Sequence, residues 1–104
     1  MPTIEELLHA YYAGDDAALN QLSARLRRPL GRIAVVILRS RGVARGALVE
    51  WDVHACLVRV WVGVALSRVG GRARWVHERW SALRWLIGIL CEQMDWTMGF
   101  REPY

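Results

Sequence analysis

The chain has 104 residues and a mass of 11.9 kDa, which gives room for one domain and no second globular unit. Hydrophobic residues make up 54% of the sequence and charged residues 23%, a balance that excludes an intrinsically disordered chain. All 14 basic residues are arginine, and the net charge of +4 favours a polyanionic partner.

The sequence carries no signal for export or for a membrane span. Its first residues include Glu5 and Glu6 and lack the charge order of a signal peptide. The longest uncharged apolar run is Val60–Ser67, whereas a spanning helix needs about 20 residues. Cys56 and Cys91 show no disulfide-framework spacing, so we expect reduced thiols, with a single bridge as the alternative. These features predict a soluble, cytoplasmic protein with no membrane partner.

A short first helix is predicted at the N-terminus. Thr3 followed by Glu6 is a capping-box pattern. Apolar residues then recur at helical spacing until Gly14, which allows a left-handed stop. The predicted apolar face consists of Ile4, Leu7, Leu8 and Tyr11.

A second helix is predicted to start at Asp15 or Asp16 and to end near Arg28. Proline lacks an amide hydrogen and clashes with the preceding turn, so we expect a break or kink before Pro29. The two aspartates also have the composition of a general acid and base, but their position after a glycine stop favours capping. The predicted apolar stripe consists of Ala18, Leu19, Leu22 and Leu26.

A third helix is predicted over Leu30–Leu38, followed by a connector that contains Gly42 and Gly46. The β-branched residues between Ile33 and Ile37 are also compatible with a strand. We favour a helix, because no partner strand is visible elsewhere and a lone strand has nothing to pair with. The predicted apolar residues are Ile33, Val36, Ile37 and Leu38.

The longest apolar segment, about Leu48–Ser67, predicts a fourth helix that Gly70 and Gly71 terminate. A helix that is apolar on two sides is expected to be central or to cover a partner surface. The first predicted face consists of Val53, Leu57, Val60 or Trp61, and Val64. The second consists of Val58, Val62 and Leu66.

The last helix is predicted to begin at about Glu78 or Ser81 and to end at Met98. Its inward residues are predicted to be Leu83, Leu86, Ile87, Leu90 and Met94. Five helical pieces with short joints predict an all-α fold, a compact bundle of four to five helices. We expect one domain over residues 1–99 and a loose C-terminal tail at 100–104.

Charge is sorted into a basic middle and acidic ends. Residues 21–49 contain seven arginines and no acid, and residues 67–85 contain five arginines against Glu78. The seven arginines either face phosphate or form a solvated surface paired with N-terminal acids. They are Arg25, Arg27, Arg28, Arg32, Arg39, Arg41 and Arg45.

The connector before the last helix interleaves tryptophan with arginine. Indole and guanidinium groups together suit single-stranded nucleic acid, through base stacking and neutralisation of the backbone. We expect Trp75 and Trp80 to be surface platforms and Trp85 to serve the core. The predicted nucleic-acid-binding residues are Arg72, Arg74, Trp75, Arg79, Trp80 and Arg84.

Several segments, taken in chain order, resemble the second conserved region of sigma-70-type transcription initiation factors of the extracytoplasmic-function style. The resemblance spans about residues 4–96. It is carried by Leu7-Leu8, Ala13–Leu19, Leu26–Leu30, Val53 with Leu57–Trp61, and Ala82–Ile87. The chain ends where that family continues into a helix-turn-helix domain, so we expect either a piece of a longer protein or a solitary, diverged copy.

The resemblance implies a helical domain that docks on RNA polymerase and helps to melt the −10 promoter element by capturing flipped bases. The expected partners are therefore the RNA polymerase core and promoter DNA. The resemblance places the loop at 69–80 near an extruded base. The polymerase-facing residues it implies are Glu50, Asp52, His54 and Arg59.

A protein-interaction module without promoter reading is the alternative. His54-Ala55 stands where the family carries a glutamine and an acid, and phosphate would repel Glu92 and Asp95. Such a module would use its tryptophans and its apolar helix to bind a protein partner or form a homo-oligomer. We expect neither an enzyme nor a metal or other cofactor, because catalytic motifs and zinc-ligand spacing are missing.

Overall fold

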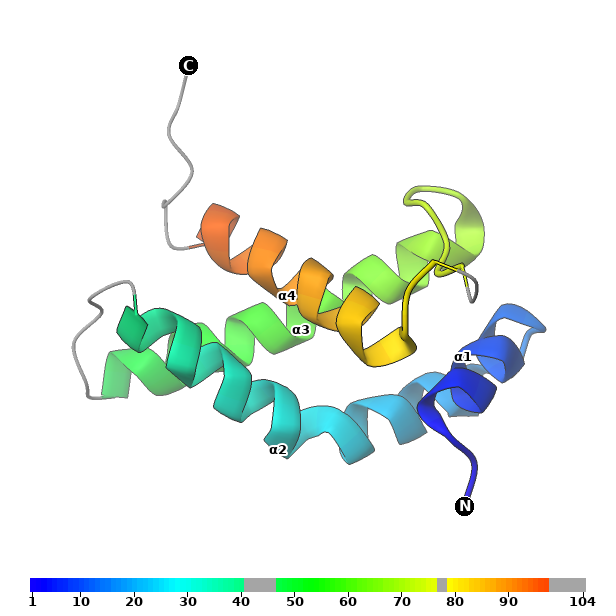
Figure 1. The fold of residues 1–104 in the computed structure, drawn as a ribbon, viewed down its shortest axis with the longest axis horizontal. Coiled ribbons are helices and arrows are strands. Elements are labelled where there is room, and N and C mark those ends of the chain that lie inside the picture. Colours follow the sequence, from blue (N-terminus) through cyan, green and yellow to red (C-terminus); the bar gives the residue numbers. More distant parts are fainter. Residues whose placement is uncertain (41–46, 77–78, 98–104) are drawn as a thin grey trace.

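The computed structural model describes residues 1–40, 47–76 and 79–97, with side chains described for residues 1–40, 53–76 and 79–94. Within these ranges the chain forms four helices and no strand (Figure 1). The helices are α1 (Ile4–Tyr12), α2 (Asp16–Ser40), α3 (Ala47–Val69) and α4 (Ala82–Thr97). This confirms the all-α prediction, and the β-branched run lies inside a helix.

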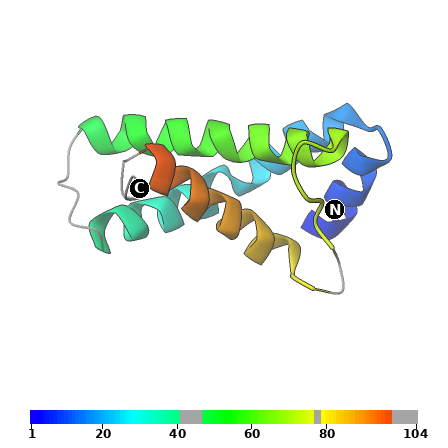
Figure 2. The same cartoon turned by 90° about the horizontal axis from the view of Figure 1, so that it is seen from above.

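The two long helices, α2 and α3, run antiparallel and form the body of the bundle (Figures 1 and 2). α4 packs against both of them, and α1 packs on α2 and α4 at one end of the molecule. None of the described helices is both long and apolar enough to cross a bilayer.

α2 continues through Pro29, so the prediction of a helix that ends near Arg28 is wrong. Figure 1 shows α2 as one continuous ribbon with a bend near its middle. Leu26 and Leu30 are both fully or nearly buried on either side of the proline. Pro29 itself is exposed, so a carbonyl that loses its partner there can bond to water. Burial of apolar side chains on both sides of Pro29 keeps the helix continuous. The second and third predicted helices are therefore one helix, and the chain has four helices within the described residues instead of five.

The predicted signals at both ends of α1 and at the start of α2 are confirmed. The Thr3 side chain accepts a hydrogen bond from the Glu6 amide at 3.1 Å. Gly14 has a φ of 110°, which few other residues adopt. The Asp15 carboxylate accepts from the Ala17 amide at 3.1 Å, as the capping interpretation predicts.

The later boundaries also follow the predicted turn chemistry. Gly70 has a φ of 91°, and the Gly71 amide donates to the Leu66 carbonyl at 2.9 Å, which closes α3. Of the two predicted starts of the last helix, Ser81 is the cap, because its hydroxyl accepts from the Arg84 amide at 3.2 Å.

Most of the predicted core residues are buried, and the differences follow the helix geometry. Val36 is 65% exposed, because the buried stripe of α2 passes through Leu30, Ala34 and Leu38 instead. In α4, Leu83 and Ile87 are only partly buried, whereas Ile89 is buried. For α3 the sequence left Val60 and Trp61 as alternatives for the inward face. Val60 is the buried one, and Trp61 is half-buried. The core comprises Leu7, Leu8, Tyr11, Ala18, Leu22, Leu26, Leu30, Ala34, Leu38, Cys56, Val60, Val64, Trp75, Ala82, Leu86, Ile89, Leu90 and Met94.

Some predictions fall outside the described residues. These are the glycine-bearing connector with Arg41 and Arg45, the pair His77-Glu78, and the tail at 100–104. Glu50 and Asp52 lie in α3, but their side chains are outside the described part.

Candidate nucleic-acid interface

Trp75 is buried, so the prediction that it is a surface platform is wrong. Its side chain is 5% exposed. The indole Nε1 donates to the Trp80 carbonyl at 2.7 Å, and the ring lies 5.0 Å from the His9 ring. The Trp75 amide donates to the Tyr12 hydroxyl at 3.1 Å. Trp75 therefore anchors the loop between α3 and α4 to α1.

The Tyr12 hydroxyl continues into a short chain of hydrogen bonds. Its oxygen lies 2.9 Å from Ser67 Oγ, and the Ser67 hydroxyl donates to the Val64 carbonyl at 2.6 Å. Each hydroxyl has one hydrogen to donate, so the Tyr12 hydroxyl donates to Ser67 while accepting from the Trp75 amide. The chain satisfies Ser67, which is the buried polar residue of α3.

Two arginines of the predicted binding set are occupied within the fold. The Arg72 guanidinium donates to Glu92 Oε1 at 2.6 Å and is partly buried. Arg74 donates to the carbonyls of Ser67 and Arg68 at 3.3 and 2.8 Å, and it lies over the Tyr12 ring. Arg74 thus satisfies free carbonyls at the C-terminal end of α3. Both guanidinium groups therefore have partners within the fold.

Arg68 is a third arginine of this region with an internal partner. It donates to Asp16 Oδ1 at 2.6 Å and lies 4.2 Å from the centre of the Tyr11 ring. The hydrogen bond to Asp16 raises the pKa of Arg68 above its ordinary value. Arg68 therefore stays charged throughout the physiological range.

Arg79, Trp80 and Arg84 of the predicted set are exposed next to the start of α4, and we call them the Trp80 patch. The Trp80 side chain is 45% exposed, and the Arg84 guanidinium lies 4.9 Å from the centre of its ring. Trp80 and Arg84 also line a hollow of 380 Å³ next to Gly88. Trp85 is half-buried against the core, as predicted.

Of the residues implied to face a polymerase, the two with described side chains, His54 and Arg59, lie on different sides of α3. His54 and Arg59 are both exposed on α3. Positions five apart differ by about 140° around a helix, so the two side chains point in different directions. His54 lines a groove between α2 and α3, and Arg59 is not among the residues that line it.

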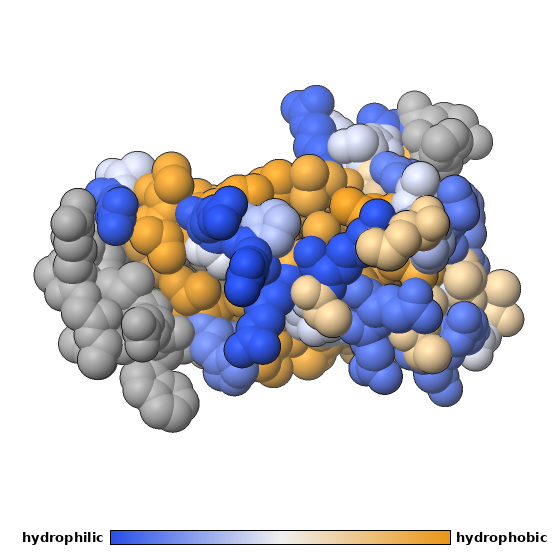
Figure 3. Space-filling view, turned by 90° about the horizontal axis from the view of Figure 1, so that it is seen from below, coloured by the Kyte–Doolittle hydropathy of each residue, from blue (hydrophilic) through white to orange (hydrophobic). Residues whose placement is uncertain are grey.

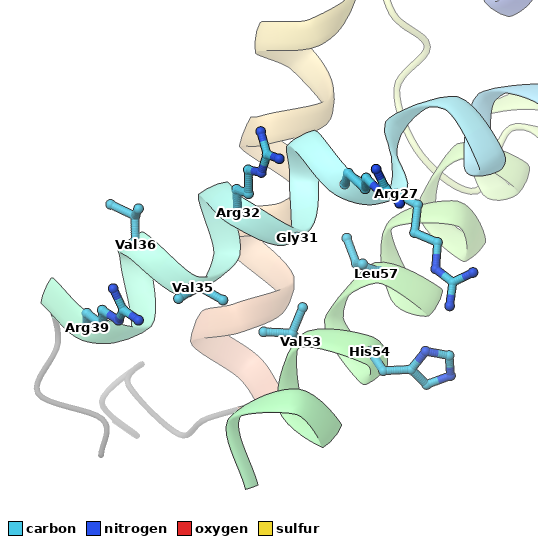
Figure 4. Close-up of a pocket in the computed structure, with 10 residues that line it drawn as sticks. Arg27, Gly31, Arg32, Val35, Val36, Arg39, Val53, His54 and Leu57 are labelled. Carbon is cyan, nitrogen blue, oxygen red and sulfur yellow. The ribbon is translucent and has the colours of Figure 1, made fainter. Parts of the chain in front are cut away.

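That groove is a site that the sequence reasoning missed. It has a volume of 610 Å³, and its basic side comes largely from α2 (Figure 4). Val35 of α2 and Val53 and Leu57 of α3 line its apolar part. Arg27, Arg28, Arg32 and Arg39 surround it. The view from below shows apolar and strongly hydrophilic side chains next to one another over this part of the surface (Figure 3).

The described residues contain no group of three metal-ligating side chains close enough to hold an ion. Cys56 is buried and Cys91 is half-buried.

Comparison with protein-family models, with curated proteins and with solved structures finds no match to this chain. Its function is therefore inferred from its own residues and their geometry.

Proposed function

We propose that this protein is a sigma region 2-like transcription protein that binds single-stranded promoter DNA through the Trp80 patch. The observation that carries the proposal is a tryptophan that the fold leaves 45% exposed, with a guanidinium held over its ring. Other large side chains of the same loop have partners within the fold: Trp75 is buried, and Arg74 donates to the Arg68 carbonyl. An exposed indole is therefore available to an outside partner.

The chemistry of the Trp80 patch suits an unpaired base. An indole offers a flat surface to any base, and a stack of this kind contributes about 1–3 kcal/mol. Arg84 restrains the ring, while Arg79 and Arg84 supply the positive charge that a phosphate backbone requires. A base flipped out of a duplex presents its flat face together with the phosphates on either side of it. The Trp80 patch therefore fits the melting of a −10 element.

The RNA polymerase core is the protein partner that this role requires. His54 and Arg59 are both exposed on α3 but on different sides of it, so each is available to a separate contact with a larger protein. A pull-down with the full chain as bait tests this part. Recovery of the polymerase core is expected, and a failure to recover it would contradict the docking.

Fluorescence anisotropy with a labelled −10-like single strand tests DNA binding. We expect binding at about 50 mM salt that weakens steeply toward about 200 mM, because released counterions drive it. Trp80→Ala should weaken binding by ~1–3 kcal/mol, and Trp80→Phe should retain most of it.

Val76→Ala provides a matched control, since Val76 is an exposed apolar residue of the same loop. This variant should bind like the original chain. The proposal fails if the single strand does not bind at low salt, or if Trp80→Ala and Val76→Ala bind equally well.

A protein-interaction module is the second candidate, favoured by an exposed apolar row on α3. Val58, Val62 and Leu66 are 49%, 52% and 43% exposed, and their spacing of four residues places them on one side of the helix. A homo-oligomer or a partner protein would cover such a row.

A further inference from the structure

The groove between α2 and α3 extends further along the two helices than its larger hollow. A second hollow of 410 Å³ adjoins it, and the two share Arg27, His54 and Leu57. Together they form one trough, which we call the seam groove. On α2 it extends from Asn20 to Arg39, which is about 28 Å at 1.5 Å per residue.

Among the described residues, no carboxylate neutralises the basic side of the seam groove. Arg27, Arg28, Arg32 and Arg39 are exposed, and among the described residues none of the four has a hydrogen bond or ion pair. No described acidic residue lines either hollow. Arg68 and Arg72, by contrast, each have a carboxylate partner. The four groove arginines are therefore available to an anionic ligand.

The spacing of the lining residues fits a third helix. On α2, Arg28, Arg32, Val35 and Arg39 follow one another at intervals of four, three and four residues. On α3, Val53 and Leu57 are four residues apart and face α2 (Figure 4). Rows with intervals of three and four form the holes into which the side chains of a neighbouring helix pack.

Charge and shape favour a helix over other anionic ligands. The stripe from Arg28 to Arg39 is about 16 Å long, which is too long for a single carboxylate head group. The aromatic side chains that line the groove are His54 and the half-buried Trp61, both on α3, so no aromatic ring lies along the arginine stripe of α2. A concave trough also contacts a flat lipid surface poorly.

We propose that the seam groove binds an acidic amphipathic helix of a partner protein. The partner's apolar side chains lie on Val35, Val53 and Leu57, and its carboxylates pair with Arg28, Arg32 and Arg39. This is a helix-in-groove interaction with charged borders. It uses residues outside the Trp80 patch, so it does not depend on the DNA-binding proposal.

Fluorescence anisotropy with designed peptides tests the proposal on the full chain. The probe is a labelled helix of about 18 residues with leucine at positions i, i+3, i+4 and i+7 and glutamate on both flanks. One control peptide replaces each leucine with serine, and another replaces each glutamate with lysine. We expect saturable binding of the probe. Both control peptides should bind at least about tenfold more weakly, because the apolar contacts and the charge pairing each contribute to binding.

Two arginines of α2 give a matched pair of variants. Arg32 lines the groove, whereas Arg25 is exposed on the same helix, outside the groove, and donates to the Pro2 carbonyl. Arg32→Ser should weaken binding of the probe peptide about tenfold, and Arg25→Ser should change that binding less than about twofold. Circular dichroism confirms that both variants keep their helices. Trp80→Ala should leave peptide binding unchanged, which separates this test from that of DNA binding.

Several results would overturn the proposal. These are the absence of saturable binding, equal binding of the serine peptide, and equal effects of Arg32→Ser and Arg25→Ser. Displacement of the probe by an oligothymidylate as effectively as by unlabelled peptide would assign the groove to nucleic acid. Displacement by vesicles of anionic lipid would assign it to a membrane surface.

Discussion

At the scale of single residues, Tyr12 joins parts of the chain that are distant in sequence. Its hydroxyl accepts from the Trp75 amide in the loop and lies 2.9 Å from Ser67 Oγ in α3. Tyr12→Phe removes both bonds and leaves the buried loop residue Trp75 with an amide that has lost this acceptor. We expect the free energy of unfolding to fall by about 1–3 kcal/mol, measured by urea denaturation with circular dichroism.

A double-mutant cycle separates this hydrogen-bond chain from a general loss of packing. Tyr12→Phe and Ser67→Ala should couple by roughly 0.5–3 kcal/mol, since both remove the same bond. The hydroxyl of Ser40 donates to the Ile37 carbonyl at 2.7 Å and lies elsewhere in the molecule, so Ser40→Ala should be additive with Tyr12→Phe. Additive effects of Tyr12 and Ser67 would contradict the shared bond.

The contrast between Trp75 and Trp80 marks a limit of prediction at this scale. Both tryptophans lie next to arginine in one short connector, and the sequence predicts the same exposed role for each. Trp75 is buried because its indole and its amide both find partners, one of them on α1. These partners are up to 63 residues apart in sequence, so no local pattern reports them.

At the scale of elements, the caps were predictable from the sequence, and the continuation of α2 through Pro29 was not. Thr3, Gly14 and Ser81 act through atoms within three or four residues, which a sequence pattern contains. Pro29 has a strong local preference to end a helix, but burial of Leu26 and Leu30 on both sides outweighs it. The outcome depends on tertiary packing, which the pattern around a proline does not include.

The packing of α3 against α4 leads to a prediction about two glycines. A Cβ at Gly63 would lie 3.1 Å from Ile89 Cγ2, and Ile89 is buried and has little room to move. Gly63→Ala should therefore lower the free energy of unfolding by about 1–3 kcal/mol. Gly88 faces open space within α4, so Gly88→Ala should raise it by about 0.5–1 kcal/mol.

Thermal denaturation of the two glycine variants checks this prediction. The expected melting temperatures change in opposite directions, although the substitution is the same and both sites are helical. A stabilising Gly63→Ala would mean that α3 and α4 are less closely packed than the structure indicates.

At the scale of the whole molecule, the fold divides the basic residues into two groups. Arg72 and Arg74 hold the loop between α3 and α4 in place, and Arg68 joins α3 to α1 and to the start of α2. The four arginines of the seam groove face outward instead. The sequence predicts the basic middle of the chain but not this division. The groove arises only because α2 continues past Pro29 and lies along α3. The sequence predicted two separate helices there, so a continuous groove between α2 and α3 was not expected.

The exposed row on α3 leads to a prediction about self-association. Val58, Val62 and Leu66 extend along only about 12 Å of the helix. A row of three side chains covers much less surface than the roughly 1,600 Å² that a stable interface buries. Any dimer formed through this row should therefore be weak and depend on concentration. We expect the mass from size-exclusion chromatography with light scattering to rise with concentration, and raised salt to change it little.

Val62→Ser should return the chain to a monomer at every concentration, because it removes the central apolar side chain of the row. Val36→Ser provides the control, since Val36 is exposed on α2 and is not part of the row. A strict monomer at all concentrations, or a dimer that persists in Val62→Ser, would rule out self-association through α3. A dimer that dissociates steeply as salt rises would instead indicate contact between the acidic α1 end and the arginines of α2.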